Sequence, residues 1–179
     1  MNEKIIAFEY IITLLINWLR ELTGLDKETA LKEFNKLKLF KLHFFVSAIE
    51  NKETREDLLD TFNEFWALPY GPVESYIYNN LNETRIYNIT REAITTKANN
   101  DTNDYFNTLP EDLRLAIDHS IEELKSVNQL IVTYSAFELV ELSHQWPVWR
   151  MLYTRALSQG KRSTEMPSSL IRASSKIFK

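Results

Sequence analysis

Apolar residues recur at three- and four-residue steps through most of this chain, the spacing that places side chains on one face of an α-helix. The first such series stops at Gly24, a residue type suited to a left-handed helix cap, and consists of Ile5, Phe8, Ile12, Leu15, Leu19 and Leu22. Further helices are expected from Asp26 to Glu33 and over 35–49, 54–66, 108–127, 135–144, 147–160 and 167–178. The pattern predicts a mainly all-α fold: a compact bundle of about eight helices in a single domain, residues 1–179.

Three segments depart from this helical pattern. Residues 84–90, TRIYNIT, alternate in polarity and predict one short β-strand or hairpin. Residues 99–107 are rich in Asn and Asp and predict a mobile loop, and residues 161–167 predict a linker before the last helix. Two capping boxes, Thr108 with Glu111 and Ser135 with Glu138, indicate where two of the helices begin.

The composition argues against several classes of protein. The chain has no cysteine, so disulfides and thiolate chemistry are excluded, and a reducing compartment such as the cytoplasm fits. The apolar run at 11–19 is nine residues long and contains Thr13 and Asn17, whereas a membrane span needs about 20 apolar residues. The net charge of −4 gives no general electrostatic reason to expect a nucleic-acid partner.

The charge is unevenly distributed along the chain. Residues 155–179 contain six basic side chains and one acidic side chain, so this part carries +5 and residues 1–154 carry −9. Two interpretations remain open: the basic part is a solvated terminal helix, or it is a docking surface for an acidic partner.

The stretch WALPYGPVE, residues 66–74, concentrates one of three glycines and two of five prolines within four positions. Pro69 disfavours helical geometry at the preceding residue, so the helix over 54–66 is expected to end by about Ala67. Pro72 suits the first position of a following helix, with Glu74 near its N-terminus. The stretch therefore predicts a helix stop, a sharp turn at Gly71 and a helix start. It either presents Tyr70 and Val73 on a stiff edge or simply joins two helices across the core.

Catalytic signatures are scarce. Glu141 and His144 have the spacing found in carboxylate di-iron bundles, but neither other histidine has a glutamate three positions earlier. A glycine-rich phosphate loop and a nucleophile elbow are absent from the sequence. We therefore predict no enzyme, no catalytic residue, no metal site, no cofactor and no small-molecule substrate.

Aromatic residues gather beside the two proline corners. Trp66 and Trp149 are expected to be mostly core, whereas Tyr70 and Trp146 lie in predicted turns and are expected to be partly exposed. Buried aromatic side chains contribute large areas to cores and to interfaces alike.

Three segments together resemble the Panacea domain family, the SocA-like antitoxin domain of bacteria and phages. They are LKLFKLHFF at 37–45; Phe65–Trp66 with YGPV at 70–73 and Tyr78; and LVELSH at 139–144 with Pro147 and Trp149. Their order and spacing follow the family pattern, and the likeness extends over about residues 5–178. Leu68 and Pro69 lengthen the usual spacing between the tryptophan and YGPV, and Val148 separates a proline and a tryptophan that usually adjoin.

The resemblance implies a cytoplasmic antitoxin that binds a cognate toxin protein and neutralises it by direct contact. Two alternatives remain: an adaptor that presents a toxin to a Clp-type protease, or a phage-derived interaction module without a surviving toxin. The resemblance implies no membrane partner and, for this chain alone, no nucleic-acid partner. The candidate partner-binding residues are Trp66, Tyr70, Gly71, Pro72, Val73, His144, Trp146 and Trp149.

Overall fold

A computed structural model of the protein describes residues 2–49, 57–97 and 102–179. This part of the chain is mostly helical, as expected, with ten α-helices where about eight were predicted. They are α1 (Glu3–Thr23), α2 (Lys27–Lys32), α3 (Lys36–Ala48), α4 (Leu58–Thr61), α5 (Ser75–Asn79), α6 (Thr102–Phe106), α7 (Glu111–Val127), α8 (Ala136–His144), α9 (Pro147–Ser158) and α10 (Ser168–Ala173). Two short 3-10 helices lie at Leu81–Glu83 and Ile131–Thr133.

Several helix boundaries follow from local capping. Gly24 has φ +71° and its N–H bonds to the carbonyl of Arg20, which confirms the predicted end of α1. Asp26, Asn35 and Ser135 each accept a backbone N–H as N-caps, and Ser135 forms the predicted capping box with Glu138. The capping box predicted at Thr108 is wrong. The Thr108 hydroxyl instead donates to the carbonyl of Tyr105, and α7 begins at Glu111.

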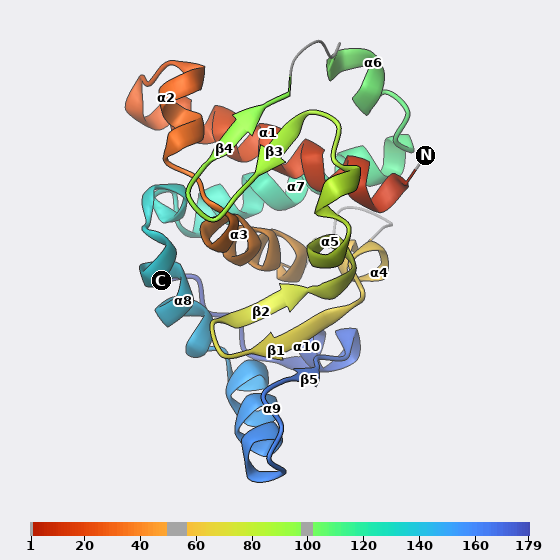
Figure 1. Ribbon diagram of the computed structural model, residues 1–179, viewed down its shortest axis with the longest axis vertical. Helices are drawn as coiled ribbons and strands as arrows, with labels where there is room; N and C mark the ends of the chain where they lie inside the picture. The colour runs from red at the N-terminus through yellow and green to blue at the C-terminus, as the bar shows by residue number, and fades with distance from the viewer. Residues whose placement is uncertain (1, 50–56, 98–101) are drawn as a thin grey trace.

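Helix α3 is the centre of the molecule. It lies between α1 and α7 on one side and a small sheet on the other (Figure 1). A helix packed on all sides has no polar face, and α3 is buried from Lys38 to Ala48. Its buried set includes Lys41, His43 and Ser47. The ring nitrogens of His43 and the hydroxyl of Ser47 have no hydrogen-bond partner among the residues that the structure describes. Burial lowers the pKa of His43 to about 3.

Five short strands accompany the helices: β1 (Phe65–Leu68), β2 (Gly71–Glu74), β3 (Tyr87–Ile89), β4 (Ile94–Thr96) and β5 (Thr164–Glu165). One antiparallel sheet has the order β2-β1-β5, and β3 pairs with β4 in a second. The strand predicted within 84–90 is confirmed as β3, with Tyr87 opposite Thr96.

Other expectations need correction. The linker predicted at 161–167 contains β5, which pairs with β1. The last helix ends at Ala173, because the chain becomes extended at Ser174 with ψ 148°. Of the loop predicted at 99–107, residues 99–101 lie outside the described residues, and residues 102–106 form α6. The helix predicted over 54–66 is limited to α4 among the described residues, since Phe62 has φ −98° and ψ 77°.

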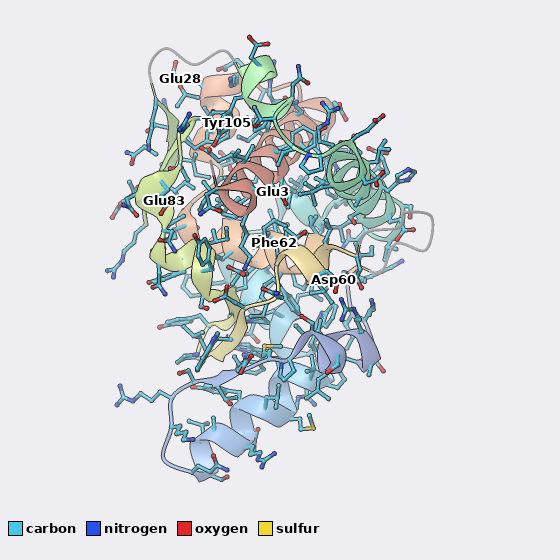
Figure 2. The ribbon with its side chains drawn as sticks, turned by 90° about the vertical axis from the view of Figure 1, so that its right-hand side faces the viewer. Glu3, Glu28, Asp60, Phe62, Glu83 and Tyr105 are labelled. Atoms are coloured by element: carbon cyan, nitrogen blue, oxygen red, sulfur yellow. The ribbon has the colours of Figure 1, made fainter. Side chains whose placement is uncertain are left out.

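Helix α9 stands at one end of the molecule. Figures 1 and 2, taken at right angles, both show it with the returning segment below the rest of the fold. Among the described residues, no helix combines the length and apolar character that crossing a membrane would require.

Candidate interaction site at the 65–74 hairpin

The WALPYGPVE stretch lies in a β-hairpin formed by β1, a Pro69–Tyr70 turn and β2, called here the 65–74 hairpin. Leu68 pairs with Gly71 and Phe65 pairs with Glu74. Gly71 has φ +91°, a conformation that other residues rarely adopt. Proline as the first turn residue and a left-handed glycine directly after the turn suit a tight hairpin connection.

The predicted sharp turn is present, but the predicted helix ends on its two sides are wrong, because both flanking segments are strands and α5 begins only at Ser75. Along β1 the side chains alternate, with Phe65 and Ala67 buried and Trp66 and Leu68 half-buried. The three-residue step from Phe62 to Phe65 resembles helical spacing, but Phe62 already has a non-helical backbone. The alternation and the proline–glycine spacing were the sequence signals that favoured a hairpin.

The tip of the hairpin is held by two side chains from α8 and α9. The Nε2 atom of His144 lies 3.1 Å from the Pro69 carbonyl oxygen, and Trp149 Nε1 donates to the Leu68 carbonyl over 3.1 Å. A carbonyl can only accept, so His144 carries its hydrogen on Nε2. Partial burial lowers the pKa of His144, which favours this neutral form.

The two clamping rings also form a stack. The imidazole of His144 and the indole of Trp149 have centroids 3.9 Å apart and planes 12° apart. Tyr153 continues the stack, 4.9 Å from Trp149 with planes 17° apart. Side chains from two helices thus share one rigid arrangement beside the turn.

Lys41 of α3 binds the second strand of the hairpin. Its Nζ atom donates to the Pro72 carbonyl over 2.5 Å, and its side chain is fully buried. Burial lowers the pKa of Lys41 to about 7, because the interior does not solvate an ammonium group. A Cβ atom added at Gly71 would lie 2.3 Å from Ser143 Oγ and 3.2 Å from Lys41 Nζ. Glycine therefore lets the strand approach α3 and α8 closely.

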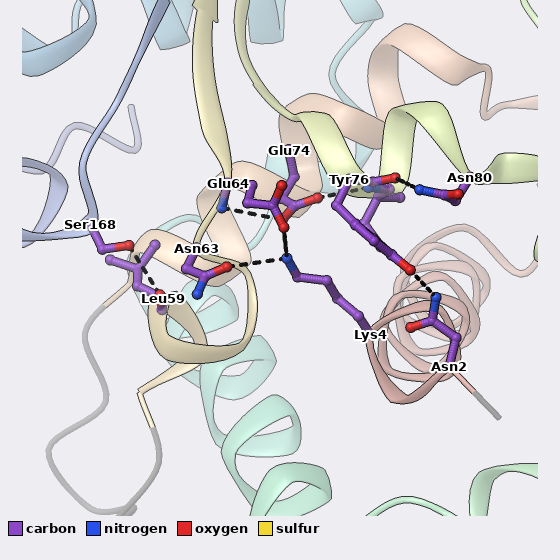
Figure 3. A network of polar contacts seen from close by, with 10 residues as sticks. Asn2, Lys4, Leu59, Asn63, Glu64, Glu74, Tyr76, Asn80 and Ser168 are labelled. Carbon is purple, nitrogen blue, oxygen red and sulfur yellow. Dashed lines mark hydrogen bonds and ion pairs between the residues drawn. The ribbon is translucent and has the colours of Figure 1, made fainter.

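The base of the hairpin is fixed by a buried carboxylate (Figure 3). Glu74 is the N-cap of α5 and accepts the backbone N–H of Ile77, and its carboxylate also accepts the backbone N–H of Glu64. Lys4 from α1 lies 2.7 Å from the same carboxylate and 3.1 Å from Glu64. The hairpin is thus attached to α1 at its base and to α8 and α9 at its tip.

The structure places the eight predicted partner-binding residues differently. Tyr70 is 61% exposed at the turn, so the expectation of exposure is confirmed for this residue. Trp66 and His144 are half-buried, while Gly71, Pro72, Val73, Trp146 and Trp149 are buried.

The expected exposure of Trp146 is wrong. Its ring lies 4.8 Å from Phe44 and 5.4 Å from Phe178, and its Nε1 donates to the Ile177 carbonyl over 2.6 Å. The C-terminal residues cover this indole, a contact at long sequence separation that local pattern reading did not find. Trp149 is largely core, as expected, and Trp66 only partly so.

Sequence reasoning missed three members of this site: Lys41, Ser143 and Tyr153. The available signal for Lys41 was a lysine between apolar neighbours in the segment 37–45, where no polar helix face could accommodate it. Among the described residues, no group of three or more His, Cys, Asp or Glu side chains could hold a metal ion. What the hairpin offers is a fixed, exposed tyrosine, an arrangement suited to binding.

Comparison with known protein families gave a match. A family model described as antitoxin SocA-like, Panacea domain matches residues 39–150, more than half of the chain. The matched range contains most of α3, the 65–74 hairpin, α8 and the start of α9, which the contacts above bring together. No curated protein and no solved structure gave a match.

Proposed function

The chain belongs to the family of SocA-like antitoxin Panacea domains, and on that premise we propose that it binds a toxin protein through the surface around Tyr70 and neutralises it by direct contact. The proposal places this activity in the cytoplasm and requires no catalytic step. The toxin is expected to be encoded nearby.

The observation that carries this proposal is the exposed Tyr70 on a turn whose backbone is already fixed. Two backbone carbonyls where the turn begins accept hydrogen bonds: that of Leu68 from Trp149 and that of Pro69 from His144. Binding through a preordered element loses less conformational entropy than binding through a mobile loop. Tyrosine is also among the residues that contribute most at protein interfaces.

Direct neutralisation is tested by co-expression. Neighbouring genes are expressed singly to find one that arrests growth, and then together with the wild-type chain, Tyr70→Ala or Leu115→Ala. Leu115 is 44% exposed on α7 and serves as an apolar surface control. We expect wild type and Leu115→Ala to restore growth, and Tyr70→Ala to bind the purified toxin roughly tenfold or more weakly.

The alternative adaptor mechanism gives a different result. An adaptor lowers the amount of toxin only in cells that contain the Clp-type protease, whereas a neutraliser leaves a stable complex in cells that lack it. If growth is restored only in cells that contain the protease, the adaptor mechanism is supported and direct neutralisation is contradicted. Failure of the wild-type chain to bind any growth-arresting neighbour would contradict both.

A further inference from the structure

Helix α9 and the turn after it carry a net positive charge, whereas the rest of the chain is net negative. Residues 142–164 contain four basic side chains, Arg150, Arg155, Lys161 and Arg162, and no Asp or Glu. This segment carries +4, so the remainder carries −8 against a total of −4. Arg150 and Arg155 belong to α9, which stands at one end of the molecule (Figure 1).

Within the described part of the chain, no acidic side chain neutralises these four cations. None forms an ion pair with any residue that the structure describes. Arg172, by contrast, pairs with Asp57 at 2.6 Å and Asp60 at 2.5 Å. The basic surface predicted over 155–179 is therefore partly neutralised within the fold, and its free portion is centred on α9.

The outer face of α9 is also apolar in part. Met151 is 55% exposed and Leu157 is 52% exposed. A shallow surface depression is lined by Pro147, Arg150, Met151, Thr154, Arg155 and Ser158. The opposite face of the helix, with Val148, Trp149, Leu152 and Ala156, is buried against the fold. Methionine adapts its shape to different partners, and arginine binds carboxylates through two hydrogen bonds.

We propose that the outer face of α9 and the turn at 159–162 dock an acidic amphipathic helix of the toxin. This inference rests on the proposed function and specifies the partner's chemistry. An apolar stripe of the partner covers Met151 and Leu157, and its flanking carboxylates pair with Arg150 and Arg155. Trp149 and Tyr153 of the same helix stack beside the hairpin tip, so α9 connects this surface to the hairpin.

A protein segment fits this face better than a nucleic acid does. Proteins bind phosphate backbones with many cations on a surface of positive electrostatic potential. This chain carries a net charge of −8 outside residues 142–164, which repels phosphate. Burial of the exposed Met151 and Leu157 side chains against an apolar partner lowers the free energy, whereas contact with phosphate does not. Carboxylates flanking an apolar stripe satisfy both features of the face.

The inference is tested with purified protein and a synthetic fluorescent peptide of about 18 residues, long enough for about five helical turns. Leucines stand at i, i+3, i+4 and i+7, with glutamates beside them. A second peptide has lysine in place of each glutamate, and a short duplex DNA provides the nucleic-acid arm. Binding is measured by fluorescence anisotropy to the wild-type chain and to the double variant R150E/R155E.

The matched control is K27E/K32E on α2, which changes the net charge equally at a distant, exposed site (Figure 1). We expect the acidic peptide to bind wild type and K27E/K32E alike, and R150E/R155E roughly tenfold or more weakly. Raising the salt from about 50 to about 300 mM is expected to weaken binding severalfold. The lysine peptide and the DNA are expected to bind more weakly than the acidic peptide.

Several outcomes would overturn the inference: no binding of the acidic peptide, equal binding to wild type and R150E/R155E, or preferred binding of DNA. The co-expression assay separates this result from the proposed function. If R150E/R155E neutralises the toxin as well as wild type while Tyr70→Ala does not, the α9 inference fails and the proposed function stands. If the wild-type chain binds no toxin, the proposed function fails, and the inference that α9 docks a helix of the toxin fails with it.

Discussion

The indole nitrogen of Trp149 donates a hydrogen bond of 3.1 Å to the carbonyl oxygen of Leu68, joining α9 to the start of the hairpin turn across 81 positions of sequence. The same indole is stacked on His144, whose Nε2 atom contacts the next carbonyl, that of Pro69. Two adjacent backbone acceptors are therefore bound by two stacked rings, and the orientation of Tyr70 depends on both.

Replacement of Trp149 by phenylalanine tests this clamp. Trp149→Phe retains an aromatic ring but leaves the Leu68 carbonyl without its donor, so we expect a loss of about 1–3 kcal/mol in the free energy of unfolding. Tyr153→Phe is the control, because its hydroxyl has no hydrogen-bond partner among the described residues, and its effect should stay within about 0.5 kcal/mol. Urea denaturation measures both, and equal effects of the two variants would argue against the clamp.

Gly71→Ala tests the close approach of the hairpin to α8. The added Cβ would meet Ser143 Oγ at 2.3 Å, and the backbone at φ +91° disfavours any side chain. We expect a loss of roughly 2–4 kcal/mol from the combined clash and backbone strain. Ser143→Ala removes the nearest atom, so the double variant should recover part of the loss. Strict additivity of the two substitutions in a thermal denaturation cycle would contradict the contact.

The buried Lys41 predicts a specific pH dependence of stability. Its pKa is about 7 in the folded protein, against 10.5 when unperturbed. Between these values the unfolded chain holds the proton and the folded chain does not, so stability rises as pH increases through this window. The destabilisation is complete below about pH 7.

Lys41→Met keeps an unbranched side chain that is one atom shorter and removes the titration. We expect wild type to gain stability relative to Lys41→Met between pH 7 and about 10, as measured by urea denaturation at several pH values. Groups that do not interact with Lys41 cancel in the difference, whereas His144, whose pKa is lowered by burial and also by Lys41, titrates below this window. Parallel pH profiles would show that Lys41 does not titrate as described.

The ion pair at the base of the hairpin makes a fourth prediction. Glu74 is fully buried and Lys4 is 2.7 Å away, so Lys4→Met leaves a buried carboxylate without its cation. We expect a loss of about 3–5 kcal/mol. Adding Glu74→Gln removes the uncompensated charge and should restore part of this loss. Glu64→Gln, at the half-exposed partner of Lys4, is expected to cost under about 1 kcal/mol. Calorimetric unfolding distinguishes these three outcomes.

Local sequence determined much of the helical fold. The caps at Gly24, Asp26, Asn35 and Ser135 are formed by residues within four positions of the helix ends that they define. Such interactions do not depend on the rest of the chain, so reading them from sequence succeeded. The motifs that identified the family were also visible in the sequence, although their roles in the structure were not.

Tertiary structure decided the site. Residues 65–74 form a hairpin because β5, α3, α8 and α9 pack against it, and periodicity in a short apolar run does not distinguish that outcome from a helix end. Trp146 is buried because the C-terminal residues cover it, and Tyr70 remains exposed because nothing in the described fold packs over the turn. Burial depends on contacts between distant segments, so the sequence by itself determined the helices and the family, and only the folded chain decided which aromatic residue a partner could reach.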